Sequence, residues 1–230
     1  ILRGSVSLKM ARCVAGGPSA IVERHASSRT VATSVSRGRW VVSPRQTVTG
    51  GVHSTFIYSQ PKYGTHIYLT NDGTGYMHVI DINDPYHPKE VARWTTRPDQ
   101  IGNALHDIDV QDGLAYLSYW NEGLVIVNIG NGVKGGSPSN PQLVSQYKYD
   151  LNTLYRDVEA VGGPGFIRGT HTAWRHGKYV FIADEVFPAS GVKGAKDAAS
   201  FRAYGRLQVV DVSDLEHPRS GDDRLGVEGV

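Results

Sequence analysis

Three stretches of this sequence repeat one pattern of residues. They are Tyr68–Pro88 (YLTNDGTGYMHVIDINDPYHP), Tyr116–Gly132 (YLSYWNEGLVIVNIGNG) and Phe181–Pro218, which begins FIADEVF and ends GRLQVVDVSDLEHP. Each contains an aromatic-led apolar run, a polar turn, and an aliphatic run that ends in Asp or Asn before a further turn. A recurrence over tens of residues is typical of repeat architectures, and it constrains the fold more strongly than any local motif does.

Each repeat unit contains the signals of four short antiparallel strands. Polar and apolar residues alternate in HSTFIYS and THIYLT, as they do in half-buried strands. Asn71-Asp72-Gly73 is typical of a hairpin turn, and Asp112-Gly113 repeats this signal in the second unit. A unit spans about 45–50 residues, which is the size of a propeller blade. We therefore predict an all-β propeller with about three blades, at residues 50–100, 101–150 and 166–220.

The ends of the chain lie outside this repeat. Residues 1–49 form a basic leader with little patterning, in which we expect one strand at Arg39–Val42, and 221–230 resemble the start of a linker or of a further blade. Three blades do not close a ring. We therefore expect an incomplete propeller within a longer parent chain, or self-association through open blade edges.

Composition and charge narrow the classes of partner. The net charge of +2 is unevenly distributed along the chain. Residues 1–50 contain eight Lys and Arg residues and only one acidic residue, Glu23, whereas the repeat body is mildly acidic. This distribution does not favour nucleic-acid binding. Cys13 is the only cysteine, so no internal disulfide is possible, and no apolar run is long enough for a membrane span.

The aliphatic runs carry a family resemblance. GYMHVIDINDPYHP, GLVIVNIGNG and GRLQVVDVSDLEHP resemble the LVIVD repeat, and the resemblance covers residues 50–220. It implies a propeller fold and a secreted, periplasmic or cell-surface location, chiefly in bacteria and archaea, without a known reaction. YLSYWNEG and the turn after it show a weaker similarity to the selenium-binding protein and methanethiol oxidase propellers, which hold a metal through histidines near the propeller axis.

One histidine stands at the start of the first strand of each unit. These are His53, His106 and His171. The first strand of each blade lines the axis of a propeller, so three imidazoles from successive blades could meet around one Cu, Zn or Fe ion. Asp107 could add a ligand or orient one. Alternatively, these histidines link neighbouring blades by hydrogen bonds.

A carboxylate pair provides the second candidate site. Asp184 and Glu185 follow a strand and precede the second of two insertions, which span residues 150–168 and 188–204. Such a pair could bind a ligand or cation, or it could simply begin a solvated loop. Asp72 and Trp120 occupy the equivalent turn in the other two units, and this recurrence favours a structural role.

Three functions remain open at this point. The first is an exported or cell-surface scaffold that binds a protein or small-molecule ligand through its top-face loops. The second is a metal-dependent enzyme, an oxidase or hydrolase, with the histidine cluster at its axis. The third is a part of a larger scaffold without separate activity. Asp81, Asn128 and Asp211 are expected to cap turns rather than to act chemically.

Overall fold

The computed structural model describes residues 32–36, 39–43, 51–99, 104–149, 166–188 and 205–221. Within these ranges the regular structure is β, apart from one short 3-10 turn, η1 (Val133–Gly135). The first two strands, β1 (Ala32–Ser36) and β2 (Arg39–Ser43), pair as an antiparallel hairpin. This hairpin confirms the strand predicted in the leader.

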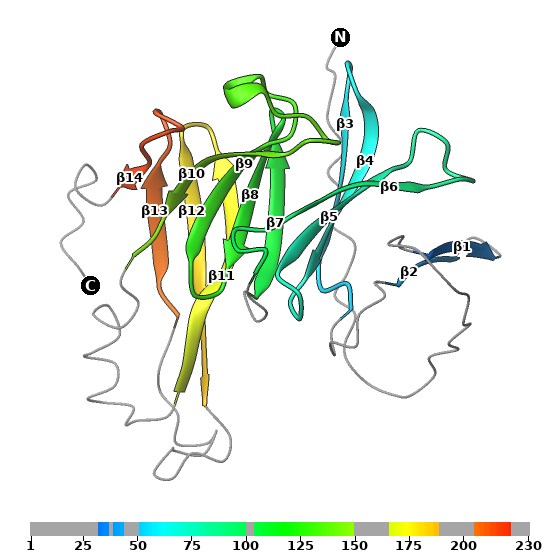
Figure 1. Cartoon of the computed structure of the whole chain (residues 1–230). Helices are drawn as coiled ribbons and strands as arrows, with labels where there is room; N and C mark the ends of the chain where they lie inside the picture. The colour runs from blue at the N-terminus through cyan, green and yellow to red at the C-terminus, as the bar shows by residue number, and fades with distance from the viewer. Residues whose placement is uncertain are drawn as a thin grey trace.

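The remaining strands form three four-stranded antiparallel sheets, which lie side by side in Figure 1. Sheet one contains β3 (Thr55–Gln60), β4 (Gly64–Asn71), β5 (Tyr76–Asp81) and β6 (Lys89–Trp94). Sheet two contains β7 (Leu105–Gln111), β8 (Leu114–Tyr119), β9 (Gly123–Asn128) and β10 (Gln142–Tyr147). Sheet three contains β11 (Phe166–His176), β12 (Tyr179–Pro188), β13 (Leu207–Asp211) and β14 (Arg219–Ser220).

Each sheet is an up-and-down meander in which consecutive strands pair. The first strand of sheet two and of sheet three packs against the preceding sheet. β7 packs against β3 and β4, and β11 packs against β7 and β8. The last strands, β6, β10 and β14, lie at the far edges. Four-stranded meanders stacked through their first strands are propeller blades, so the predicted fold class is confirmed.

Two apolar clusters hold the three sheets together. One lies between sheets one and two and includes Tyr68, Val79, Leu117 and Val127, all fully buried. The other lies between sheets two and three. Its members include Tyr116, Leu124, Ile126, Val180, Ile182 and Val210. Sheet two is therefore covered on both faces, and this explains why every residue of β8 and β9 is buried.

The recurring acidic and amide residues cap turns, as predicted. Asp81 Oδ1 accepts the Asn83 backbone N–H at 2.8 Å, Asn128 Oδ1 accepts that of Gly130 at 2.7 Å, and Asp211 Oδ1 accepts that of Ser213 at 2.8 Å. A short polar side chain at a strand end thus accepts a backbone N–H of the turn, where no neighbouring strand offers a carbonyl.

Candidate metal centre

Two of the three repeat histidines occupy β-bulges. The pairing of β7 with β8 skips His106, because Leu105 pairs with Tyr119 and Asp107 with Ser118. The pairing of β11 with β12 skips His171 in the same way. His53 lies just before β3, where its N–H donates to the Thr70 carbonyl at 2.9 Å. A bulge redirects a side chain relative to its strand, and here it turns each imidazole toward the neighbouring sheet.

The three imidazoles lie in one row across the sheets. The ring centroids of His53 and His106 are 4.1 Å apart, and those of His106 and His171 are 4.2 Å apart. His53 Nδ1 lies 2.7 Å from the His106 carbonyl oxygen. The structure therefore brings together the histidines that the repeat pattern singled out.

Each outer histidine faces a carboxylate of its own sheet. His53 Nε2 lies 3.5 Å from Asp72 Oδ2, and His171 Nε2 lies 3.5 Å from Glu185 Oε2. The same Glu185 oxygen lies 4.0 Å from His106 Nε2. Asp72 and Glu185 occupy corresponding positions just beyond or within the second strand of their sheets. The corresponding residue in sheet two is Trp120, whose ring centroid is 5.3 Å from that of His106.

These side chains form two triads that share His106. One comprises His53, Asp72 and His106, and the other comprises His106, His171 and Glu185; within each, one ligand atom from every residue lies within 4.8 Å of the others. The sequence suggested three histidines around one ion. The geometry instead gives two groups, each with two histidines and one carboxylate. Two histidines and one carboxylate are a ligand set of zinc and non-haem iron sites.

Hydrogen bonds fix which nitrogen of His171 carries its proton. Thr172 Oγ1 donates to Asp107 Oδ2 at 3.0 Å, because a carboxylate can only accept. The Thr172 hydroxyl proton is thus engaged, and His171 Nδ1, 2.8 Å away, must donate its N–H to that oxygen. His171 Nε2 is left facing Glu185 Oε2 at 3.5 Å.

The same reasoning applies to His53. Its Nδ1 must donate to the His106 carbonyl, since a carbonyl oxygen has no proton to give. Its Nε2 therefore faces Asp72 Oδ2. In both triads an imidazole Nε2 and a carboxylate oxygen are held opposite each other at 3.5 Å.

Asp107 joins the three sheets beneath the histidine row. Its Oδ1 accepts the Ser54 hydroxyl of sheet one at 2.6 Å, and its Oδ2 accepts that of Thr172 on sheet three. Ser54, Asp107 and Thr172 each follow the histidine of their own unit. Asp107 therefore links neighbouring blades and positions His171 through Thr172, and both of its oxygens are engaged in doing so.

Burial shifts the pKa values of two triad members, His106 and Asp72. Burial chiefly, and then the neighbouring His171 and His53, lowers the pKa of His106 to about 4. Burial raises the pKa of Asp72 to about 6, against the opposing effect of His53. His106 Nδ1 and Asp72 Oδ1 are buried without a hydrogen-bond partner within the described part of the chain. His106 is thus a neutral imidazole at neutral pH, which is the form that binds metals.

Asp184, the other member of the predicted carboxylate pair, lies away from the histidines. Successive residues of a strand point to opposite faces, so Asp184 and Glu185 diverge. Asp184 Oδ1 accepts the Tyr149 hydroxyl at 2.5 Å, and Gln208 Nε2 lies 3.4 Å from Asp184 Oδ2. Asp184 belongs to a buried network on the other side of β12.

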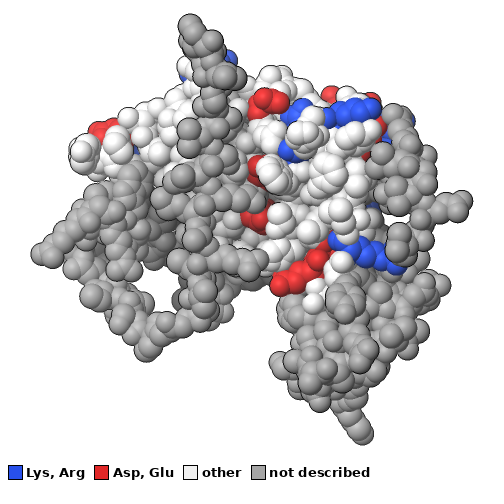
Figure 2. Space-filling view, turned by 180° about the vertical axis from the view of Figure 1, so that it is seen from behind, with Lys and Arg blue, Asp and Glu red and all other residues white. Residues whose placement is uncertain are grey.

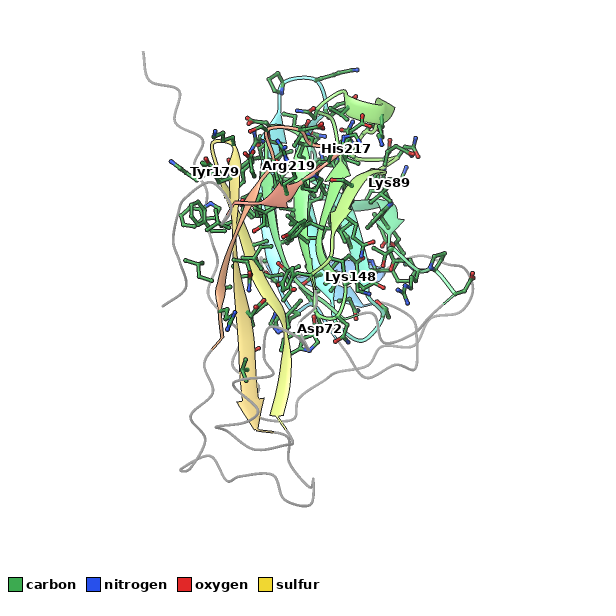
Figure 3. All side chains as sticks on the ribbon, turned by 90° about the vertical axis from the view of Figure 1, so that its left-hand side faces the viewer. Asp72, Lys89, Lys148, Tyr179, His217 and Arg219 are labelled. Atoms are coloured by element: carbon green, nitrogen blue, oxygen red, sulfur yellow. The ribbon has the colours of Figure 1, made fainter. Side chains whose placement is uncertain are left out.

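The sequence pattern predicts only a turn role for Asp72. The structure places its carboxylate beside His53. The useful signal was its recurrence: Asp72, Trp120 and Glu185 each stand four residues after the equivalent aromatic residue of their unit. Figure 3 shows Asp72 at the end of the sheets opposite to the turn that carries His217. The side chains of His87 and His217 are 84% and 79% exposed and lie in surface turns away from the histidine row.

The charged side chains offer no extended basic surface on the face drawn in Figure 2. There the described Lys and Arg residues are interspersed with Asp and Glu. Within the described ranges, no helix has the length and hydrophobicity needed to cross a membrane.

Comparison with known families gives one match. The family described as the LVIVD repeat matches residues 63–96 and 102–149, which cover most of sheets one and two. No curated protein and no solved structure gives a significant match. The comparisons thus support the LVIVD resemblance in two of the three units and give no support to the similarity with selenium-binding proteins.

Proposed function

Because this chain belongs to the LVIVD-repeat family, whose repeats build propeller-type sheets, we propose that it is a binding scaffold that holds a divalent transition-metal ion at its histidine row. The ion would be bound by His106 Nε2, His171 Nε2 and Glu185 Oε2. The observation that carries this proposal is the position of His171 Nε2, whose Nδ1–H is held by Thr172, 3.5 Å from Glu185 Oε2.

An imidazole nitrogen and a carboxylate oxygen at this separation can both bind one cation. Ligand bonds of 2.0–2.2 Å in a tetrahedral site place neighbouring ligand atoms roughly 3.3–3.6 Å apart, and the His171–Glu185 distance lies in that range. The longer separation of 4.0 Å between His106 and Glu185 requires a small adjustment of one side chain. Imidazole nitrogen with carboxylate oxygen suits Zn, Cu or Fe better than Mg or Ca, which prefer oxygen ligands alone.

The triad that contains Glu185 is the better candidate of the two. Both triads contain His106; of the remaining histidines, His171 is 23% exposed and His53 is 42% exposed, while the carboxylates Glu185 and Asp72 are 41% and 34% exposed. The less exposed histidine loses less conformational freedom on binding, and Thr172 and Asp107 already fix the orientation of His171. His53 and Asp72 form a second, weaker position that shares His106.

Binding of Zn²⁺ and Co²⁺ to protein purified without a chelating tag tests this proposal. We expect one tight equivalent of Zn²⁺ by titration calorimetry, no comparable binding of Mg²⁺, and visible Co²⁺ absorption of the kind given by tetrahedral nitrogen and oxygen ligands. Glu185→Gln keeps the shape of the side chain and removes its charge, so it should weaken Zn²⁺ binding at least roughly tenfold.

Asp72→Asn is the matched control for Glu185→Gln. It should leave the tight equivalent nearly unchanged, because Asp72 belongs to the other triad. Equal loss in both variants would assign the ion to the whole row rather than to the Glu185 triad. No Zn²⁺ or Co²⁺ binding by the folded protein would overturn the proposal and leave the His53–Asp72 and His171–Glu185 contacts as ion pairs within sheets one and three.

We also propose that the scaffold acts outside the cell and that a protein or small-molecule partner binds its loops. The support is the family resemblance and the two insertions at residues 150–168 and 188–204, which lie almost entirely outside the described residues. Fractionation of cells that produce the protein tests the location.

A further inference from the structure

The loop between β9 and β10 contains the only Asn-Gly pair of the sequence, Asn131-Gly132. Both residues are exposed, although they belong to sheet two, whose faces are covered by sheets one and three. A Cβ built on Gly132 would meet no atom within 4 Å. Within the described ranges, the Gly132 N–H donates no hydrogen bond. The Gly132 nitrogen is therefore available for reaction with the side chain that precedes it.

An asparagine followed by glycine can cyclise without a catalyst, because glycine has no Cβ that hinders its own backbone nitrogen. In this reaction the Gly132 nitrogen bonds to Asn131 Cγ, and the proton of that nitrogen leaves with Nδ2 as ammonia. Water then opens the five-membered imide ring. Opening at Cγ gives aspartate, and opening at the backbone carbonyl gives isoaspartate, in which the main chain runs through Cβ. Water is the only co-reactant, and nothing is oxidised or reduced.

The Asn131 side chain holds the turn between β7 and β8. Its Nδ2 donates to the Asp112 carbonyl oxygen at 2.7 Å, and its backbone N–H donates to Asn128 Oδ1 at 2.8 Å. Asp112 has a φ of 51°, which is uncommon for a residue other than glycine. A carbonyl oxygen can only accept a hydrogen bond, so the contact with Asp112 requires the amide group of Asn131.

We propose that Asn131 is a site of spontaneous deamidation and that the product releases the Asp112 turn. A carboxylate at position 131 has no proton to donate, so it would oppose the Asp112 carbonyl oxygen across a contact that is now 2.7 Å. It would also add a negative charge beside the Asp112 carboxylate, which lies 3.3 Å from Arg175 Nη1 of β11. The modification therefore loosens the contact between the β7–β8 hairpin and the loop after β9 as the protein ages.

Peptide mapping by mass spectrometry, after incubation of the folded protein at mildly alkaline pH, tests the reaction. Asn140 is the internal control, since it is exposed in the same loop but is followed by Pro141, which has no N–H. We expect Asn131 to convert to aspartate and isoaspartate at least roughly tenfold faster than Asn140. Conversion of Asn131 no faster than that of Asn140, or no conversion at all, would overturn the proposal.

Asn131→Asp and Asn140→Asp separate the loss of a donor from the added charge. Asn140 Oδ1 accepts from Gln142 Nε2 at 2.9 Å, and an aspartate keeps that acceptor. Urea denaturation should therefore show a lower midpoint for Asn131→Asp and a midpoint close to that of the wild type for Asn140→Asp. Equal midpoints would show that the turn is not released. If Asn131→Asp does not fold, deamidated wild-type protein isolated by ion exchange takes its place. Neither experiment depends on the proposed metal site.

Discussion

Thr172 Oγ1 lies 3.0 Å from Asp107 Oδ2, and this hydrogen bond joins the first strand of sheet three to the first strand of sheet two. The same hydroxyl accepts the Nδ1–H of His171 at 2.8 Å. One threonine thus links two blades and sets the orientation and tautomer of a candidate ligand.

Replacement of this threonine should weaken metal binding. Thr172→Val keeps the β-branched shape and removes the acceptor of His171 Nδ1–H, so the imidazole loses its fixed tautomer. Substitutions of such supporting residues cost about 10–100-fold in metal affinity, and we expect a loss in that range for Zn²⁺ by calorimetry. Thr172→Ser restores the hydroxyl and should recover most of the affinity. Unchanged affinity in Thr172→Val would exclude a positioning role.

A methyl group at Gly169 should disturb the packing beside the histidine row. A Cβ added there would lie 2.2 Å from Trp120 Cδ2, and Trp120 in turn lies against His106. We expect Gly169→Ala to lower the free energy of unfolding by about 1–3 kcal/mol, as overpacking does, and to shift the tryptophan fluorescence. Gly51→Ala is the control, since a Cβ at Gly51 meets no atom within 4 Å. Equal stability of the two variants would contradict this packing.

Removal of the Tyr149 hydroxyl should destabilise sheet three. That hydroxyl donates to Asp184, which is 8% exposed, and lies 2.7 Å from Thr170 Oγ1. Tyr149→Phe leaves a buried carboxylate with one donor fewer, and this costs about 1–3 kcal/mol of unfolding free energy. Urea denaturation measures the change. Tyr86→Phe, at a tyrosine that is 77% exposed, should change stability by only a few tenths of that amount.

Acid should destabilise the fold through His66. Burial lowers the pKa of His66 below 6.5, and Asp81 only partly offsets this effect. The unfolded chain therefore binds a proton at this site before the folded chain does, so the unfolding free energy falls as the pH drops below about 6.5 and stops falling below the folded pKa. The lowered pKa of His106 acts in the same direction.

Denaturation at about pH 7.5 and about pH 5 for the wild type and His66→Gln measures this contribution. The difference in unfolding free energy between the two pH values should be smaller in the variant, which cannot take up that proton. A variant with the same or a larger difference would show that burial of His66 does not shape the acid response.

Local signals in the sequence predicted the sheets and much of the site. These signals are the alternation of polar and apolar residues along a strand, the Asp112-Gly113 turn, and the capping residues Asp81 and Asp211. Each depends only on residues nearby in the chain, so it can be recognised without coordinates. The histidine row could be anticipated because the repeat places one imidazole at the first strand of each unit. The partners of those imidazoles are not local, and the recurrence of the turn position predicts only a structural role for Asp72.

The sequence by itself determined the repeat, the four strands per unit, and one histidine in each. Only the tertiary structure decided that Glu185 and Asp72 face these histidines, that Asp184 points away, and that the cluster divides into two triads sharing His106. The physical reason is that side-chain direction at His106 and His171 depends on β-bulges, and distances between sheets depend on how neighbouring blades pack. Both are properties of strand pairing and packing between segments far apart in the chain, which a local pattern does not encode.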